Sequence, residues 1–208
     1  MRTFIAFAFF IMLTSFNFLG DTPTLKMSVA ESDTIEGKDK ESCYSCGDCS
    51  IYCLLDDNYS ISSSSYLSAQ GKNKYTASEM DDYNLQTAWF EGKPDYGIGE
   101  WLKFDFNEER FSGSDTEIDG LYLFNGYRKS LQRWKENSRI KKLLVYVNDK
   151  KFVVLKLADT YKMQHIKFEG IKLKETKSIK FEILEVYKGE KYSDVGVSEI
   201  KFTGIHHH

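Results

Sequence analysis

From about residue 60 onward the chain consists of short segments in which apolar and polar residues alternate. Residues 101–106 have the sequence Trp-Leu-Lys-Phe-Asp-Phe, and residues 142–147 the sequence Lys-Leu-Leu-Val-Tyr-Val. A period of two places every second side chain on the same face of an extended strand. The same pattern recurs in residues 120–124, 151–157, 165–168, 178–184 and 198–202. Because polar or glycine-bearing loops separate these segments, the pattern predicts an all-β, antiparallel sandwich or barrel.

The composition of the 208-residue chain agrees with a strand-rich fold. Aromatic residues make up 15% of it, and only two prolines are present. The 28 Lys and Arg residues are nearly balanced by 31 Asp and Glu residues. Since nucleic-acid binding requires an excess of basic residues on one surface, we do not expect a nucleic-acid partner. Only residues 131–137 could form a turn of helix, on a loop between two strands.

The amino terminus has the features of a secretory signal peptide. Met1 and Arg2 precede an apolar run at residues 4–13, which is shorter than the roughly 18 to 20 apolar residues of a membrane-spanning helix. We therefore predict that residues 1–20 are cleaved and that the mature protein has no transmembrane segment and is secreted, periplasmic or attached to the cell surface. An uncleaved anchor helix is the alternative.

Residues 21–59 are predicted to form a polar linker with a Cys-rich segment. All four cysteines of the chain lie there, at Cys43, Cys46, Cys49 and Cys53. Their spacing matches half of a bacterial ferredoxin signature, but Leu54 stands where that signature has proline. In an oxidising compartment such a cluster favours two disulfides, with three pairings open. A zinc site, an iron–sulfur cluster or unpaired thiols remain alternatives.

Five short motifs follow one another in the domain. They are Asp-x-Asn-x-x-Thr-Ala-Trp at 82–89, Gly-Glu-Trp at 99–101, Asn-Gly-Tyr at 125–127, Asn-x-Arg-x-Lys at 137–141 and Ser-Glu-Ile at 198–200. In this order they resemble the discoidin, or coagulation factor V/VIII type C, superfamily, and most closely its NAD glycohydrolase translocation branch. The resemblance covers roughly residues 64–204. It implies a galactose-binding-like jelly-roll sandwich, here residues 60–205, that binds sugars and does not catalyse a reaction.

The first motif also suggests a cation site. Calcium binds six to eight oxygens from carboxylates, carbonyls and hydroxyls, and Asp82, Asn84 and Thr87 bring such oxygens together in one loop. The resemblance implies a structural calcium ion completed by Glu199, and no other cofactor. The alternative is that the three loop residues only build a turn. Two departures from the family pattern are a shorter loop and Tyr83 in place of the usual glycine.

The loop after residue 124 carries the densest collection of side chains suited to sugar binding. A sugar site needs an aromatic surface beside planar hydrogen-bonding groups. The predicted ligand-binding residues on this loop are Tyr127, Arg128, Trp134, Asn137 and Arg139, and Phe90 and Glu91 on a second loop could join them. Each could instead serve packing or form a salt bridge. We expect Trp89 and Trp101 to lie in the core.

No catalytic constellation is evident. The internal His165 has no serine or cysteine motif beside it, and the adjacent carboxylates at 81–82 and 108–109 are not set on opposite sides of a cleft. Residues 206–208 are taken as a histidine tail and excluded. The sequence therefore predicts a secreted, non-catalytic module that binds a glycan or glycoconjugate. The alternative is a protein-interaction or adhesion module of the cell envelope.

Overall fold

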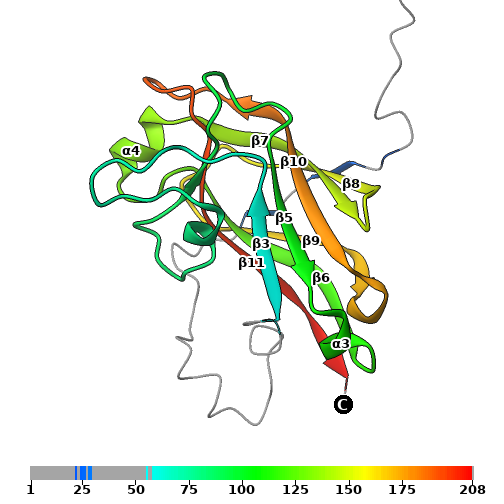
Figure 1. Ribbon diagram of the computed structural model, residues 1–208. Coiled ribbons are helices and arrows are strands. Elements are labelled where there is room, and N and C mark those ends of the chain that lie inside the picture. Colours follow the sequence, from blue (N-terminus) through cyan, green and yellow to red (C-terminus); the bar gives the residue numbers. More distant parts are fainter. Residues whose placement is uncertain (1–21, 23, 27, 30–54, 56–57, 208) are drawn as a thin grey trace, which may run out of the picture.

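The computed structural model describes residues 22, 24–26, 28–29, 55 and 58–207. These residues form two β-sheets packed face to face (Figure 1). The strand order is β1-β8-β7-β10-β5-β3 in the first sheet and β2-β9-β6-β11-β4 in the second. Neighbouring strands are antiparallel except β1 and β8, which are parallel. The predicted antiparallel sandwich is confirmed.

The elements have the following bounds. The first sheet contains β1 (Thr24–Lys26), β3 (Tyr59–Ser63), β5 (Trp101–Phe106), β7 (Arg139–Val147), β8 (Lys150–Lys156) and β10 (Ser178–Tyr187). The second contains β2 (Ser28–Val29), β4 (Trp89–Phe90), β6 (Asp115–Asn125), β9 (Gln164–Lys172) and β11 (Gly196–His207). The short helices are α3 (Glu108–Phe111) and α4 (Leu131–Glu136), with 3-10 turns η1 (Ala77–Met80) and η2 (Leu173–Glu175).

All seven alternating segments lie on strands, and the predicted helical turn is α4. The sequence did not reveal β3, whose outward positions are serines, or β4, which is only two residues long. Two further strands, β1 and β2, lie within the predicted linker and pair with β8 and β9. At the other end, β11 continues to His207, opposite Asp115, so it enters the predicted histidine tail.

The core lies between the sheets and follows the alternation. On β5, Leu102, Phe104 and Phe106 are buried, whereas Trp101 is only half-buried, on the opposite face of the strand. Trp89 is buried as expected. The expectation that Trp101 is a core residue is wrong, because β5 begins with that residue facing away from the second sheet.

Aromatic rings join the two sheets at the centre of this core. The ring of Phe202, on β11, lies 4.8 Å from that of Phe104 and 6.2 Å from that of Phe181, which come from β5 and β10 of the other sheet. Phe104 also packs edge to face against Tyr59 on β3, at 5.3 Å. Edge-to-face contacts between buried rings add to the stabilisation from burial itself. Four strands from two sheets are thus held by one cluster of rings.

The N-terminal predictions fall on residues that are not described. The predicted signal peptide and all four cysteines lie outside the described residues, so export and the state of the cysteines stay predictions. Among the described helices, none is both long and apolar enough to cross a membrane.

Replacing Phe104 with alanine tests the importance of the ring cluster. The ring is fully buried, so its loss should lower the free energy of unfolding by about 3 to 5 kcal/mol in urea denaturation. Ile205, on the same β11 strand as Phe202 but 49% exposed, provides the control, because Ile205→Ala should cost less than about 1 kcal/mol. Equal losses in the two variants would contradict this description of the core.

Candidate functional site

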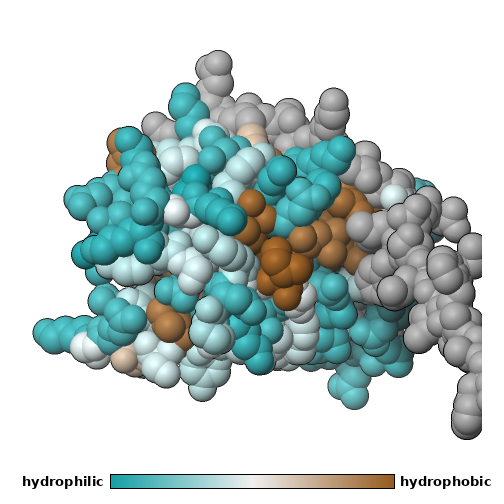
Figure 2. Space-filling view, turned by 90° about the horizontal axis from the view of Figure 1, so that it is seen from above, coloured by the Kyte–Doolittle hydropathy of each residue, from teal (hydrophilic) through white to brown (hydrophobic). Residues whose placement is uncertain are grey.

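Loops from several strands meet at the end of the sandwich near α4, which lies at the left in Figure 1. They enclose a cavity of about 220 Å³, here named the loop-end cavity. Its lining residues are Leu67, Gln70, Asn73, Tyr75, Phe90, Tyr127, Lys129, Arg133, Asn137, Tyr192 and Asp194. Figure 2 looks down on the molecule from above and shows mainly hydrophilic residues, with hydrophobic surface confined to a few patches.

The floor of the loop-end cavity is aromatic. Phe90 packs edge to face against Tyr75 on one side, at 5.3 Å, and against Tyr127 on the other, at 5.2 Å. With Ala88 and Leu67 these rings form a small hydrophobic cluster separate from the main core. Burial raises the pKa of both tyrosines above its ordinary value. Tyrosine hydroxyl groups are protonated at neutral pH and can donate hydrogen bonds there.

The rim is polar and carries both signs of charge. The Lys129 ammonium donates to Oδ1 of Asn73 at 3.1 Å, and the Arg133 guanidinium pairs with Glu136 at 3.0 Å. Asp194 is half-buried, and burial raises its pKa. A ligand in the cavity would therefore meet an aromatic surface below and donors and acceptors around it.

Two glycines let the backbone pass close to this site. Gly126 has φ +83°, and a Cβ there would lie 2.7 Å from Cδ1 of Trp134. Gly196 passes the Phe90 ring so closely that a Cβ would lie 2.7 Å from Cζ. Beside them, the Asn125 side chain donates to the carbonyl of Ile140 at 2.7 Å and accepts from its amide at 3.0 Å. The Asn-Gly-Tyr motif thus fixes the turn after β6 by sterics and by hydrogen bonding.

Three of the seven predicted ligand-binding residues line the loop-end cavity, namely Phe90, Tyr127 and Asn137. The Asn137 amide also caps α4 by donating to the carbonyl of Arg133 at 2.7 Å. Glu91 lies next to the cavity but is completely buried, and it accepts hydrogen bonds from the amides of Lys93 and Val195. It ties the loop after β4 to the start of β11.

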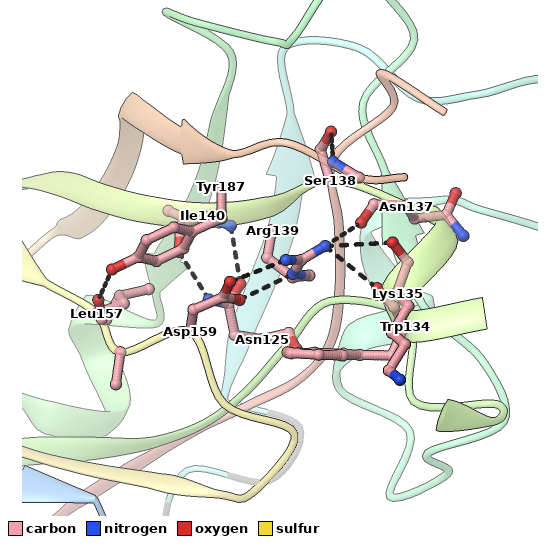
Figure 3. Close-up of polar contacts among 12 residues, drawn as sticks. Asn125, Trp134, Lys135, Asn137, Ser138, Arg139, Ile140, Leu157, Asp159 and Tyr187 are labelled. Atoms are coloured by element: carbon pink, nitrogen blue, oxygen red, sulfur yellow. Dashed lines mark hydrogen bonds and ion pairs between the residues drawn. The ribbon is translucent and has the colours of Figure 1, made fainter. Parts of the chain in front are cut away.

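Trp134 and Arg139 are buried and do not line the cavity; Figure 3 shows their polar contacts. The Trp134 ring is 9% exposed and donates from Nε1 to the carbonyl of Asn125 at 2.9 Å. The Arg139 guanidinium lies 4.5 Å from this ring, donates twice to Asp159 at 2.9 Å, and donates to the carbonyl of Asn137 at 2.8 Å. These contacts position the 125–139 loop, and direct contact of the two side chains with a ligand stays a prediction.

Arg128 is also directed into the protein. Its guanidinium lies 3.5 Å from the ring centre of Tyr161 and 5.0 Å from that of Phe124. The Tyr161 hydroxyl donates back to the carbonyl of Arg128 at 3.2 Å. Arg128 therefore joins the Asn-Gly-Tyr turn to the loop between β8 and β9, and its predicted contact with ligand is likewise untested.

Most of the residues that line the cavity were not predicted from the sequence as ligand-binding. Lys129 and Arg133 lie on the loop it favoured, and Tyr75, Tyr192 and Asp194 lie within segments chosen for their motifs. The segment from Leu67 to Asn73 gave no signal, because only the tertiary fold brings it to the cavity.

The predicted calcium ligands lie outside the loop-end cavity, in the loop that follows η1 and on β11. The Thr87 hydroxyl donates to both carboxylate oxygens of Asp82, at 3.0 and 2.8 Å, and Oδ1 of Asp82 accepts from the amide of Asn84 at 2.9 Å. Glu199 is completely buried, which raises its pKa to about 8, and Lys201 opposes this rise. In the part of the chain that the structure describes, no group of three or more His, Cys, Asp or Glu side chains could hold a metal ion.

The fold and the loop-end cavity define a β-sandwich of the F5/8 type C class. The model of the family "NAD glycohydrolase translocation F5/8 type C domain" matches residues 51–203. The chain belongs to this family, and the predicted resemblance is confirmed. No curated protein matches the chain.

Several solved structures have a similar fold. The CBM32-1 and CBM32-2 domains of Clostridium perfringens ZmpB match with a TM-score of 0.53 and 15% identity, over 88% of this chain and 41% of theirs. The same domains in complex with GalNAc match at 0.50 and 13%, over 88% and 40%. A mutant of the mycobacterial arabinofuranosyltransferase AftD matches at 0.51 and 16%, over 72% and 11%. The chain thus spans less than half of each of these proteins, and the likeness is one of fold.

Glu91 should make folding stability depend on pH. Burial raises its pKa from 4.5 in a free side chain to about 7. The folded state therefore binds this proton more tightly, so the stability it contributes is complete below about pH 4.5 and is lost as the pH rises through about 7. In urea denaturation across this range, Glu91→Gln should remove that part of the decline. Glu169→Gln, at an exposed position on β9, should retain this decline. If the unfolding free energy fell with pH equally in the unmodified chain and in both variants, Glu91 would not be the group responsible.

Arg139 should stabilise the loop far more than a surface arginine does. Arg139→Met removes the five hydrogen bonds that the guanidinium donates to Asp159 and to the carbonyls of Trp134, Lys135 and Asn137. Since Asp159 stays partly in water, we expect a loss of about 2 to 3 kcal/mol in unfolding free energy. The control is Arg133→Met, since the Arg133 side chain is 51% exposed in its pair with Glu136 and should contribute less than about 1 kcal/mol. A loss at Arg139 no larger than at Arg133 would show that the buried contacts do not hold the loop.

Proposed function

We propose that this domain binds a glycan non-covalently in the loop-end cavity and has no catalytic role of its own. The observation that carries the proposal is the combination of an aromatic floor and a polar rim in one cavity. Sugar rings present C–H groups on their faces and hydroxyl groups at their edges. A site with both kinds of surface is therefore complementary to a sugar ring.

Five of the residues that line the cavity would contact the ligand directly. Phe90 and Tyr127 supply apolar contact, and Asn137 supplies a hydrogen-bonding amide. The charged residues Lys129 and Asp194 offer a donor and an acceptor that would discriminate between hydroxyl orientations.

The remaining predicted residues act through these side chains. Arg128, Trp134 and Arg139 hold the 125–139 loop from behind, and Glu91 holds the start of β11 next to Asp194. Mutating them would weaken binding by moving the site.

The similar structures support a sugar as the ligand. The ZmpB domains, which share the fold, were solved with GalNAc, and this makes N-acetylgalactosamine the natural first probe. We further propose that the chain is exported, because residues 1–20 have the features of a signal peptide. Export would place the domain where glycans of cell surfaces are found.

A glycan array with the purified chain tests the proposal. Lys129→Ala and Asp194→Asn should each weaken binding of the array ligands at least about tenfold, because each removes a charge-assisted hydrogen bond. The control is Lys177→Ala, since this side chain is 72% exposed and pairs with Glu108 at the far end of the sandwich. It should bind as the unmodified chain does.

Two outcomes would oppose the proposal. Failure to bind any sugar would reject it, as would equal binding by the cavity variants and the control. Capture of a protein from envelope extracts that free sugar does not release would instead favour the protein-interaction module.

A further inference from the structure

We propose that the ammonium group of Lys201 is a built-in cation that holds the 81–87 loop onto β11, beside Glu199, which the family resemblance assigns to a calcium site. The side chain is 3% exposed. This inference is independent of the glycan proposal, since it concerns a separate part of the molecule.

The ammonium lies among acidic oxygens. Its Nζ donates to the carbonyl of Asp81 at 2.9 Å and to Oδ1 of the same residue, and it lies 3.4 Å from Oε1 of Glu199. The second oxygen of Asp81, Oδ2, accepts from the Tyr59 hydroxyl at 2.8 Å. One positive charge therefore faces the two carboxyl groups that flank it from η1 and from β11.

Tyr83 covers the ammonium. Its ring centre lies 3.6 Å from Nζ, close enough for an attractive cation–π contact. The residue has φ +59°, a left-handed conformation that favours glycine. This is the position where the family pattern has glycine, so the exception to that pattern puts an aromatic ring over the buried charge.

The predicted calcium ligands do not fit a calcium ion in this arrangement. Calcium requires six to eight oxygens at roughly 2.3 to 2.6 Å. The Thr87 hydroxyl and the Asp82 carboxylate bond to each other, and Lys201 already lies within contact distance of Asp81 and Glu199. A divalent ion beside this ammonium would be strongly repelled in a buried site.

Lysine can replace a metal here because of its geometry. An ammonium offers three donors around a compact charge. Here it donates to the backbone and side chain of Asp81 and lies 3.4 Å from Oε1 of Glu199. Unlike an ion, it cannot dissociate or be removed by a chelator. The loop should therefore keep its conformation whether or not calcium is present.

Thermal unfolding of the unmodified chain gives the first test. A ligand that binds the folded state raises the melting temperature with its concentration, so we expect no shift on adding calcium chloride to millimolar levels and none on adding EDTA. A saturable rise with calcium, or a fall with EDTA that calcium restores, would overturn the proposal. This test does not depend on any variant being able to fold.

The second test removes the ammonium. Lys201→Met keeps the length of the side chain but leaves the backbone and carboxyl oxygens of Asp81 without their buried donor, so its melting temperature should fall by roughly 10 °C. The control is Lys167→Met on β9, because that lysine is 64% exposed in its pair with Asp119 and should lower the melting temperature by only a few degrees at most. A Lys201→Met protein with the same melting temperature as the unmodified chain would overturn the proposal.

Discussion

The packing of Phe202 against Phe104 and Phe181 across the two sheets is the contact on which the rest of the structure depends. It fixes β11 of one sheet over β5 and β10 of the other. Gly196, at the start of β11, lies next to Phe90. Glu199 and Lys201 follow on the same strand. The loop-end cavity and the buried ammonium are thus both positioned by the strand that this contact anchors.

Buried charged and polar groups then shape the loops that the core leaves unsupported. Arg139 donates to the Asp159 carboxylate and to three carbonyls of the loop. Lys201 likewise donates to the carbonyl and the carboxyl group of Asp81, at the end of η1. In both places the charge lies under an aromatic ring, Trp134 or Tyr83. Buried charges are tolerated only when paired and hydrogen-bonded, so each pair fixes its loop in one arrangement. The cavity floor can then stay rigid while its rim contacts solvent.

The sandwich could be predicted from the sequence because alternation is a local property that burial between two sheets enforces. The site was less predictable. The sequence selected the aromatic and arginine residues of the 125–139 loop as ligand-binding, but the directions of these side chains depend on distant partners, such as Asp159 for Arg139 and Tyr161 for Arg128. Lys201 lies on β11 at a position that alternation assigns to the outer face. It is buried because the segment after η1 folds over it, and a local pattern does not contain that information.

Backbone amide NMR of the labelled chain, during titration with N-acetylgalactosamine or the strongest array ligand, would locate the residues that bind the ligand. If the loop-end cavity binds the ligand, the shifted amides should cluster around Asn73, Tyr127 to Arg133 and Tyr192 to Asp194, and strands at the α3 end should stay unchanged. Saturable shifts centred elsewhere on the sandwich, with the cavity amides unmoved, would contradict binding in the cavity.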